Sequence, residues 1–90
     1  MLESDSPLTE PRRRRLLFRA THRGSHENDL LIGGYVARRI GTLSGQEMDA
    51  LEAILDLPDP DLADWLTGRR GIPPEFDTAL LRAIKEAGGR

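Results

Sequence analysis

The stretch Leu43-Ser44-Gly45-Gln46-Glu47-Met48 carries the clearest helix-start signal in the chain. A serine followed three residues later by a glutamate is the pattern of a capping box, in which each side chain accepts a backbone N–H of the other residue. Leu43 and Met48 flank the box and can pack against each other as a hydrophobic staple. The stretch therefore predicts a helix that begins after Ser44. The residues that we expect on its buried face are Met48, Leu51, Ile54 and Leu55.

Two further helices are predicted after this one. Asp59-Pro60 reads as an N-cap followed by proline at the first helical position, and Gly68 would end that short helix. Another helix would follow Pro73-Pro74 and stop at Gly88-Gly89. The residues that we expect to be buried in these two helices are Leu62, Trp65, Leu66, Phe76, Leu80 and Ile84.

One helix is predicted near the N-terminus. Thr9 can serve as its N-cap, Pro11 is tolerated in its first turn, and the pattern runs to about Thr21 before Gly24 breaks it. The residues that would face inward are Leu16, Leu17 and Ala20.

A second helix is predicted to begin near Ser25 or His26 and to run to about Ile40. Gly33-Gly34 lies inside it and weakens it by about 1 kcal/mol per glycine. We interpret these glycines as the place of a close contact with another helix rather than as a break. The residues that would face the core are Leu31, Ile32, Tyr35, Val36 and Ile40.

These patterns predict an all-α protein. Five helices joined by short links are typical of a compact bundle, and no stretch alternates like a strand for long enough to compete. Residues 1–8 show no periodicity and are expected to be a flexible tail, whereas residues 9–90 would form one helical domain. A chain of 90 residues supports one core, and this size argues against a large enclosed active site.

The composition argues against cysteine-based sites and against a membrane or exported protein. The chain has no cysteine, which excludes disulfides, thiolate zinc sites and cysteine nucleophiles. No apolar run approaches the roughly 18 residues of a membrane span, and the acidic N-terminus is unlike a signal or transit peptide. Twelve arginines and one lysine are typical of a GC-rich bacterial genome. We therefore expect a bacterial protein in the cytoplasm, not in a membrane.

Positive charge gathers in the first part of the chain. Residues 1–39 hold eight arginines and five acidic residues, whereas residues 40–90 hold five basic and ten acidic residues. The run Arg12-Arg13-Arg14-Arg15 admits two interpretations: a phosphate-binding arm, or a solvated helix start. A pI near 5.6 favours the second and argues against nucleic-acid binding.

Two patterns around His26 invite a chemical interpretation that we reject. His22 and His26 are four residues apart, but Gly24 between them breaks the helix that this spacing needs for a metal site. Ser25 and His26 are adjacent and therefore poorly placed to act as nucleophile and base. We expect neither a metal nor a catalytic residue in the chain.

Arg23-Gly24-Ser25-His26-Glu27 is the stretch with the strongest functional content. In structural terms, Gly24 can be a helix C-cap and Glu27 an acid that favours the first turn of the next helix. In functional terms, Gly24 can let the backbone of another protein approach while Arg23 and Glu27 offer it complementary charge. Spacing alone leaves both interpretations open.

This stretch resembles the RGxxE signature of the succinate dehydrogenase FAD assembly factors, the small flavinator proteins of bacteria and mitochondria. The segment Asp59-Pro60-Asp61-Leu62-Ala63-Asp64-Trp65-Leu66 resembles the DPDLxxWL segment of the same family, and both together are more specific than either alone. The other matching stretches are Arg15-Leu16-Leu17-Phe18, Asp29-Leu30-Leu31, Tyr35 and Leu43-Ser44.

The resemblance implies a five-helix bundle and a function. Members bind the flavoprotein subunit of succinate dehydrogenase or fumarate reductase and promote the covalent attachment of FAD to it. The factor is not an enzyme and holds no cofactor stably, because a histidine of the flavoprotein attacks the flavin while the factor supplies geometry. We expect a monomer that acts in this way, without a nucleic-acid partner.

The resemblance also implies site residues. Arg23, Gly24 and Glu27 match the motif and would form the docking surface, with Arg15 and Asp29 as flanking contacts. Ser25 departs from the methionine often found after the motif glycine, so an apolar anchor is missing there. The alternative function is a small regulatory or antitoxin-like binding module that uses the arginine-rich first helix.

Overall fold

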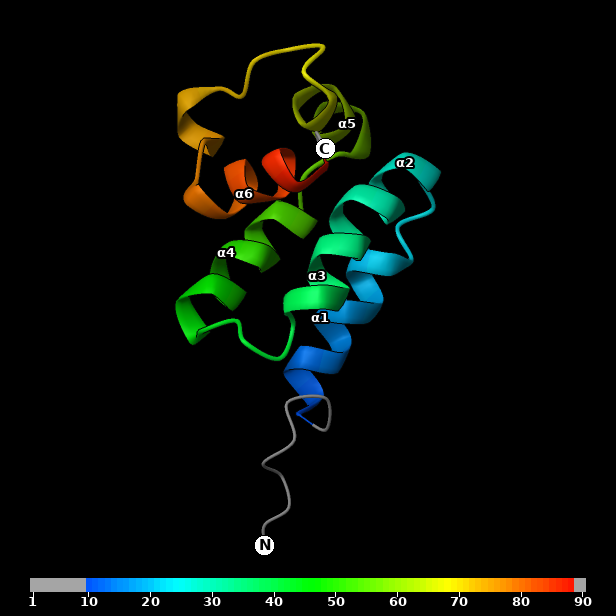
Figure 1. Cartoon of the computed structure of the whole chain (residues 1–90), viewed down its shortest axis with the longest axis vertical. Helices are drawn as coiled ribbons and strands as arrows, with labels where there is room; N and C mark the ends of the chain where they lie inside the picture. The colour runs from blue at the N-terminus through cyan, green and yellow to red at the C-terminus, as the bar shows by residue number, and fades with distance from the viewer. Residues whose placement is uncertain (1–9, 89–90) are drawn as a thin grey trace, which may run out of the picture.

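Residues 10–88, which a computed structural model describes, fold into a bundle of helices without any strand in that range (Figure 1). The elements in chain order are α1 (Pro11–Thr21), α2 (His26–Asn28), η3 (Asp29–Gly33), α3 (Gly34–Arg39), α4 (Gly45–Leu55), α5 (Asp59–Thr67), η4 (Pro74–Phe76) and α6 (Ala79–Gly88). Since α2, η3 and α3 follow one another without a break, the α-helices group into the five that the sequence predicts. The all-α prediction is confirmed. The predicted tail and the Thr9 cap lie outside the described residues.

The start of α4 is the capping box that the sequence predicts. Ser44 N donates to Glu47 Oε1 at 2.8 Å, and Glu47 N donates to Ser44 Oγ at 3.1 Å. Leu43 and Met48, the staple residues, are both buried. The two local hydrogen bonds of the capping box therefore fix where α4 begins, while contact between the staple residues stays a prediction.

The predicted second helix is interrupted by a wide turn. Its middle, η3, is a π-helix, in which backbone hydrogen bonds reach one residue further than in an α-helix. A Cβ on Gly33 would lie 2.9 Å from the Ala20 backbone oxygen of α1, so the close contact predicted at this pair is confirmed there. At Gly34 the nearest atom would be Arg38 Nη1 at 3.7 Å, an ordinary contact, so the prediction is wrong for Gly34.

The predicted cap of α5 is corrected. Pro58 occupies the N-cap position and Asp59 is the first helical residue, with no side-chain capping bond. The Asp59 carboxylate instead accepts hydrogen bonds from Arg23 and Asn28 of other elements, so it does not cap its own helix. The predicted end is confirmed, because Gly68 is the C-cap in the left-handed conformation with φ +83°.

The last helix begins later than the prolines suggest. Pro74–Phe76 forms the 3-10 turn η4, and α6 starts at Ala79. Thr78 precedes it, and its Oγ accepts the N–H of Leu81 at 3.2 Å, which is N-cap geometry. Phe76 therefore lies outside α6, where it stacks on Trp65 with ring centroids 5.4 Å apart.

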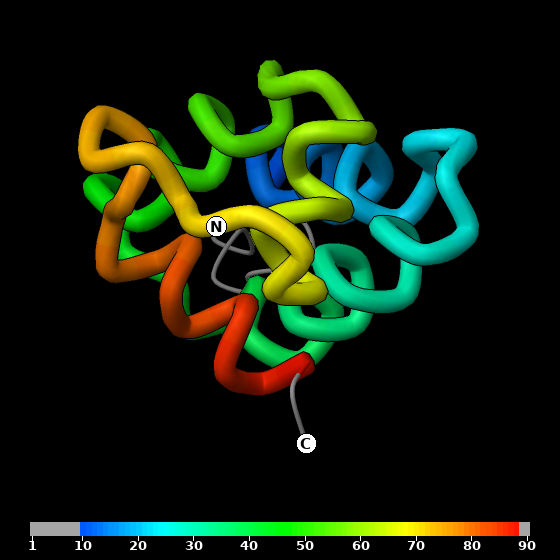
Figure 2. Tube along the Cα trace, turned by 90° about the horizontal axis from the view of Figure 1, so that it is seen from above, coloured from blue at the N-terminus to red at the C-terminus, as the bar shows by residue number. Residues whose placement is uncertain are grey.

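The helices enclose a single core cluster. α1 lies alongside α3 and α4, while α6 packs on α4 and α5 (Figure 1). The side chains at the centre, each with no exposed surface, are Ala20, Ile32, Leu51, Leu62, Leu81 and Ile84. From above, the cyan loop between α1 and α2 lies at one edge of the molecule, opposite the orange turn η4 (Figure 2). Among the residues described, no helix combines the length and apolar character of a membrane span.

Candidate partner-docking site

The loop between α1 and α2 exposes the glycine of the motif. Gly24 has a φ of +87°, a backbone conformation that residues with a Cβ seldom adopt. No atom lies within 4 Å of the place where its Cβ would stand. The local backbone therefore favours glycine, while the space above it is open.

Arg23 turns its side chain into the protein. Only 9% of the side chain is exposed, and Nε donates to Asp59 Oδ1 at 2.5 Å. Nη1 and Nη2 donate to the backbone oxygens of Leu55 and Leu57 at 2.9 and 2.8 Å. The guanidinium thus holds the corner between α4 and α5 with charge-assisted hydrogen bonds. Whether Arg23 also contacts a partner stays a prediction.

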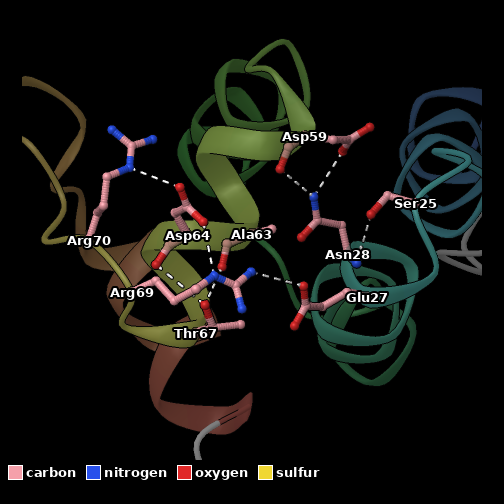
Figure 3. Close-up of polar contacts among 9 residues, drawn as sticks. All are labelled: Ser25, Glu27, Asn28, Asp59, Ala63, Asp64, Thr67, Arg69 and Arg70. Atoms are coloured by element: carbon pink, nitrogen blue, oxygen red, sulfur yellow. Dashed lines mark hydrogen bonds and ion pairs between the residues drawn. The ribbon is translucent and has the colours of Figure 1, made fainter.

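Two neighbours of the motif complete this buried network. Asn28, which has no exposed surface, donates Nδ2 to the backbone oxygen and to Oδ1 of Asp59, both at 3.0 Å (Figure 3). Asp29 accepts the N–H of Arg23 through Oδ1 at 2.8 Å. Burial acts to raise the pKa of Asp59, but the hydrogen bonds from Arg23 and Asn28 outweigh burial and lower the pKa below its ordinary value.

Glu27 lies in the first turn of α2, just after the loop, with its side chain exposed. Its side chain is 46% exposed and lies 3.4 Å from Arg69 Nη2. Arg69 also donates Nε to Asp64 at 3.0 Å, so one guanidinium spans two carboxylates from different helices (Figure 3). Hydrogen bonds to Asp64 and to Glu27 raise the pKa of Arg69. An exposed pair of this kind contributes about 0–1 kcal/mol, so Glu27 remains open to exchange.

The predicted flanking residue Arg15 lies on the exposed face of α1, and within residues 10–88 its side chain makes no hydrogen bond or ion pair. Beside it, Phe18 is 61% exposed and stacks on His22 with ring centroids 4.0 Å apart. The preceding arginines behave differently: Arg12 pairs with Asp49 and Glu52 of α4, and Arg13 donates to two backbone oxygens. The arginine run is therefore partly used inside the fold.

The remaining polar residues of the loop have local roles. Ser25 is the N-cap of α2, where its Oγ accepts the N–H of Asn28 at 3.4 Å. His22 Nδ1 lies 3.0 Å from the backbone oxygen of Phe18. No cluster of three or more possible metal ligands occurs in the part of the chain that the structure describes.

Sequence reasoning missed two residues of this site. Asn28 carries no motif signal, and its role follows only from its burial against Asp59. Arg69 lies 42 residues from Glu27, and no local pattern joins them. The joint occurrence of the RGxxE stretch and the DPDLxxWL segment could have indicated this site, because Arg23 of the first contacts Asp59 of the second.

Fold and site together define a small all-α protein whose signature residues build an exposed loop on a buried polar network. The chain belongs to the family described as "Flavinator of succinate dehydrogenase", whose sequence model matches residues 14–87.

Curated relatives are named as assembly factors. The FAD assembly factor SdhE of Acetobacter pasteurianus is 51% identical over 75 residues, which cover 83% of this chain and 69% of the relative. The mitochondrial succinate dehydrogenase assembly factor 2 of Dictyostelium discoideum is 33% identical over 84% of this chain. Factor 2-B of Drosophila melanogaster is 34% identical over 91% of it. The chain spans about half of these two mitochondrial relatives, 54% and 53%. No solved structure matches it significantly.

Proposed function

We propose that the protein is an assembly factor that binds the flavoprotein subunit of succinate dehydrogenase or fumarate reductase and promotes its covalent flavinylation with FAD. The observation that carries this proposal is an RGxxE motif, Arg23 to Glu27, with its glycine and glutamate exposed at the start of α2, in a chain of the flavinator family. The names of the relatives, FAD assembly factor and succinate dehydrogenase assembly factor, support it. The relative from a bacterium supports a place in the bacterial cytoplasm.

In this proposal the factor works by positioning and not by catalysis. Gly24, Glu27 and Arg15 form the contact surface, because they are exposed. Arg23 and Asp29 hold that surface in shape, since the Arg23 guanidinium and the Asp29 carboxylate bind groups of the chain itself. FAD stays with the flavoprotein, whose own groups form the bond. Holding two reacting groups in the right geometry can remove about 7–11 kcal/mol of a barrier.

A reconstitution tests the function. Purified apo-flavoprotein is incubated with FAD, with and without the factor, and covalent flavin is read as a fluorescent band after denaturing electrophoresis. We expect the factor to raise the rate at which the band appears. Deletion of the gene should correspondingly weaken the band in cells. A band of unchanged strength in both experiments would contradict the proposal and favour the small binding module that uses the arginine-rich helix α1.

A further inference from the structure

A hollow of about 310 Å³ opens beside Glu27. It lies between the start of the second helix, the end of α5 and the end of α6. The residues that line it are Glu27, Leu30, Leu31, Leu66, Thr67 and Gly88. Leu30 is 63% exposed, one of two large apolar side chains with such exposure among residues 10–88. The hollow therefore offers an apolar surface with a carboxylate at its rim.

The Glu27 carboxylate already forms an ion pair within the chain, with the guanidinium of Arg69. Arg69 Nη2 lies 3.4 Å from Glu27, and its Nε lies 3.0 Å from Asp64. Arg70, the next residue, binds Asp64 and Asp61 at 3.0 and 2.7 Å and points away from Glu27 (Figure 3). Both arginine side chains are about half exposed, at 56% and 52%. The two neighbours thus differ mainly in whether they reach Glu27.

We propose that this hollow receives a segment of the flavoprotein that presents an arginine or lysine beside an apolar side chain, and that the incoming cation replaces Arg69 at Glu27. This inference rests on the proposed function. A carboxylate only accepts hydrogen bonds, so its complement is a cation, and Arg69 shows that a guanidinium fits there. Leu30 supplies the apolar contact. Arg69 keeps its hydrogen bond to Asp64 after it leaves Glu27, so the exchange costs little free energy.

Arg69 therefore competes with the partner for Glu27, so removal of the Arg69 charge should strengthen binding. The dissociation constant of the complex with purified flavoprotein is measured by calorimetry for the unmodified protein and for Arg69→Gln. We expect Arg69→Gln to bind about two- to fivefold more tightly at low salt, the range that exposed ion pairs allow. The gain should shrink in concentrated salt, because both pairs are then screened. Arg70→Gln is the matched control and should leave the affinity unchanged.

A second pair of variants tests the hollow itself. Glu27→Gln should weaken binding about tenfold and should abolish the gain from Arg69→Gln in the double variant, because no carboxylate remains to compete for. Leu30→Ser should weaken binding without affecting the Arg69 gain. Unchanged melting temperatures would show that these exposed positions leave the fold intact.

The outcomes separate the two proposals. If the unmodified protein does not bind the flavoprotein, the proposed function fails and this inference with it. If it binds, and Arg69→Gln leaves the affinity unchanged or lowers it, the exchange at Glu27 is overturned while the proposed function stands.

Discussion

At the scale of single residues, Gly24 combines a backbone conformation that favours glycine with open space above it. Its φ of +87° disfavours any side chain by about 1–2 kcal/mol. Yet a side chain there would meet no atom within 4 Å, so it would project into the space that a partner would fill. We therefore expect stability at this position to respond to the presence of a Cβ, and the proposed docking to respond to the size of the side chain.

Gly24→Arg should leave the bundle folded and abolish docking to the flavoprotein. We expect a melting temperature lower by about 4–16 °C, from the strain of a Cβ at positive φ. The long side chain would block the approach of a partner backbone, so covalent flavin should fall to the level seen without the factor. Thermal melts and the flavin fluorescence band measure the two effects.

Gly24→Ala is the matched control, since it carries the same backbone strain with little added volume. It should lower the melting temperature by as much as Gly24→Arg and keep most of the flavinylation activity. Covalent flavin at the unmodified level with Gly24→Arg would show that the loop is not a docking surface.

At the scale of elements, the adjacent glycines Gly33 and Gly34 of the second helix differ in how closely other atoms approach them. A Cβ on Gly33 would meet backbone of α1, at 2.9 Å from Ala20 O and 3.2 Å from Thr21 Cα. Backbone atoms cannot turn aside as a flexible side chain can. A Cβ on Gly34 would meet only the end of the Arg38 side chain at 3.7 Å.

Gly33→Ala should therefore destabilise the protein, and Gly34→Ala should not. For Gly33→Ala we expect a loss of about 1–3 kcal/mol in the free energy of unfolding, because overpacking outweighs the gain in helix propensity. For Gly34→Ala we expect a change between zero and a gain of about 1 kcal/mol. Urea denaturation of both variants measures the difference. Equal effects of the two substitutions would contradict the close approach of η3 to α1.

The sequence predicts the start of a helix well where the residues that cap the helix are close together in the chain. The start of α4 is fixed by Ser44 and Glu47, three residues apart, and within residues 10–88 no distant group hydrogen-bonds either side chain. The start of α5 was misassigned because Asp59 binds Arg23, 36 residues away, instead of its own helix. The π-helix η3 was missed because its apolar spacing also fits an α-helix.

At the scale of the whole molecule, the candidate site joins the two sequence motifs. Arg23 reaches Leu55, Leu57 and Asp59, which lie 32 to 36 residues further along the chain. The sequence predicted that Arg23 and the Asp59 segment matter together, through the family resemblance. It did not predict that the Arg23 side chain points inward, because charged residues are usually solvated and only tertiary packing reveals the exception.

Asp59→Asn tests this network through its dependence on pH. An amide keeps the shape of the side chain but removes the charge that balances the Arg23 guanidinium, which is only 9% exposed. We expect a loss of about 2 kcal/mol in the free energy of unfolding at neutral pH, below the loss for a fully buried pair. Urea denaturation of both proteins at several pH values measures the difference.

The sign of the pH dependence follows from the lowered pKa of Asp59. A carboxylate whose folded-state pKa lies below its unfolded-state value stabilises the fold fully above the latter, here the ordinary 3.8. That stabilisation is lost as the pH falls through the lower folded-state pKa. The difference between the unmodified protein and Asp59→Asn should therefore be constant near neutrality and shrink below about pH 4.

Asp61→Asn, on the same helix but paired at the surface with Arg70, is the control and should change the free energy of unfolding by about 0.5 kcal/mol or less. A difference between the unmodified protein and Asp59→Asn that persists undiminished at pH 3 would mean that the Asp59 charge does not stabilise the network. The network would then depend on the neutral hydrogen bonds of Asn28 and the backbone oxygens alone. A shrinking difference would place the Arg23–Asp59 pair among the interactions that hold the motif loop against α5, the arrangement on which the proposed docking surface depends.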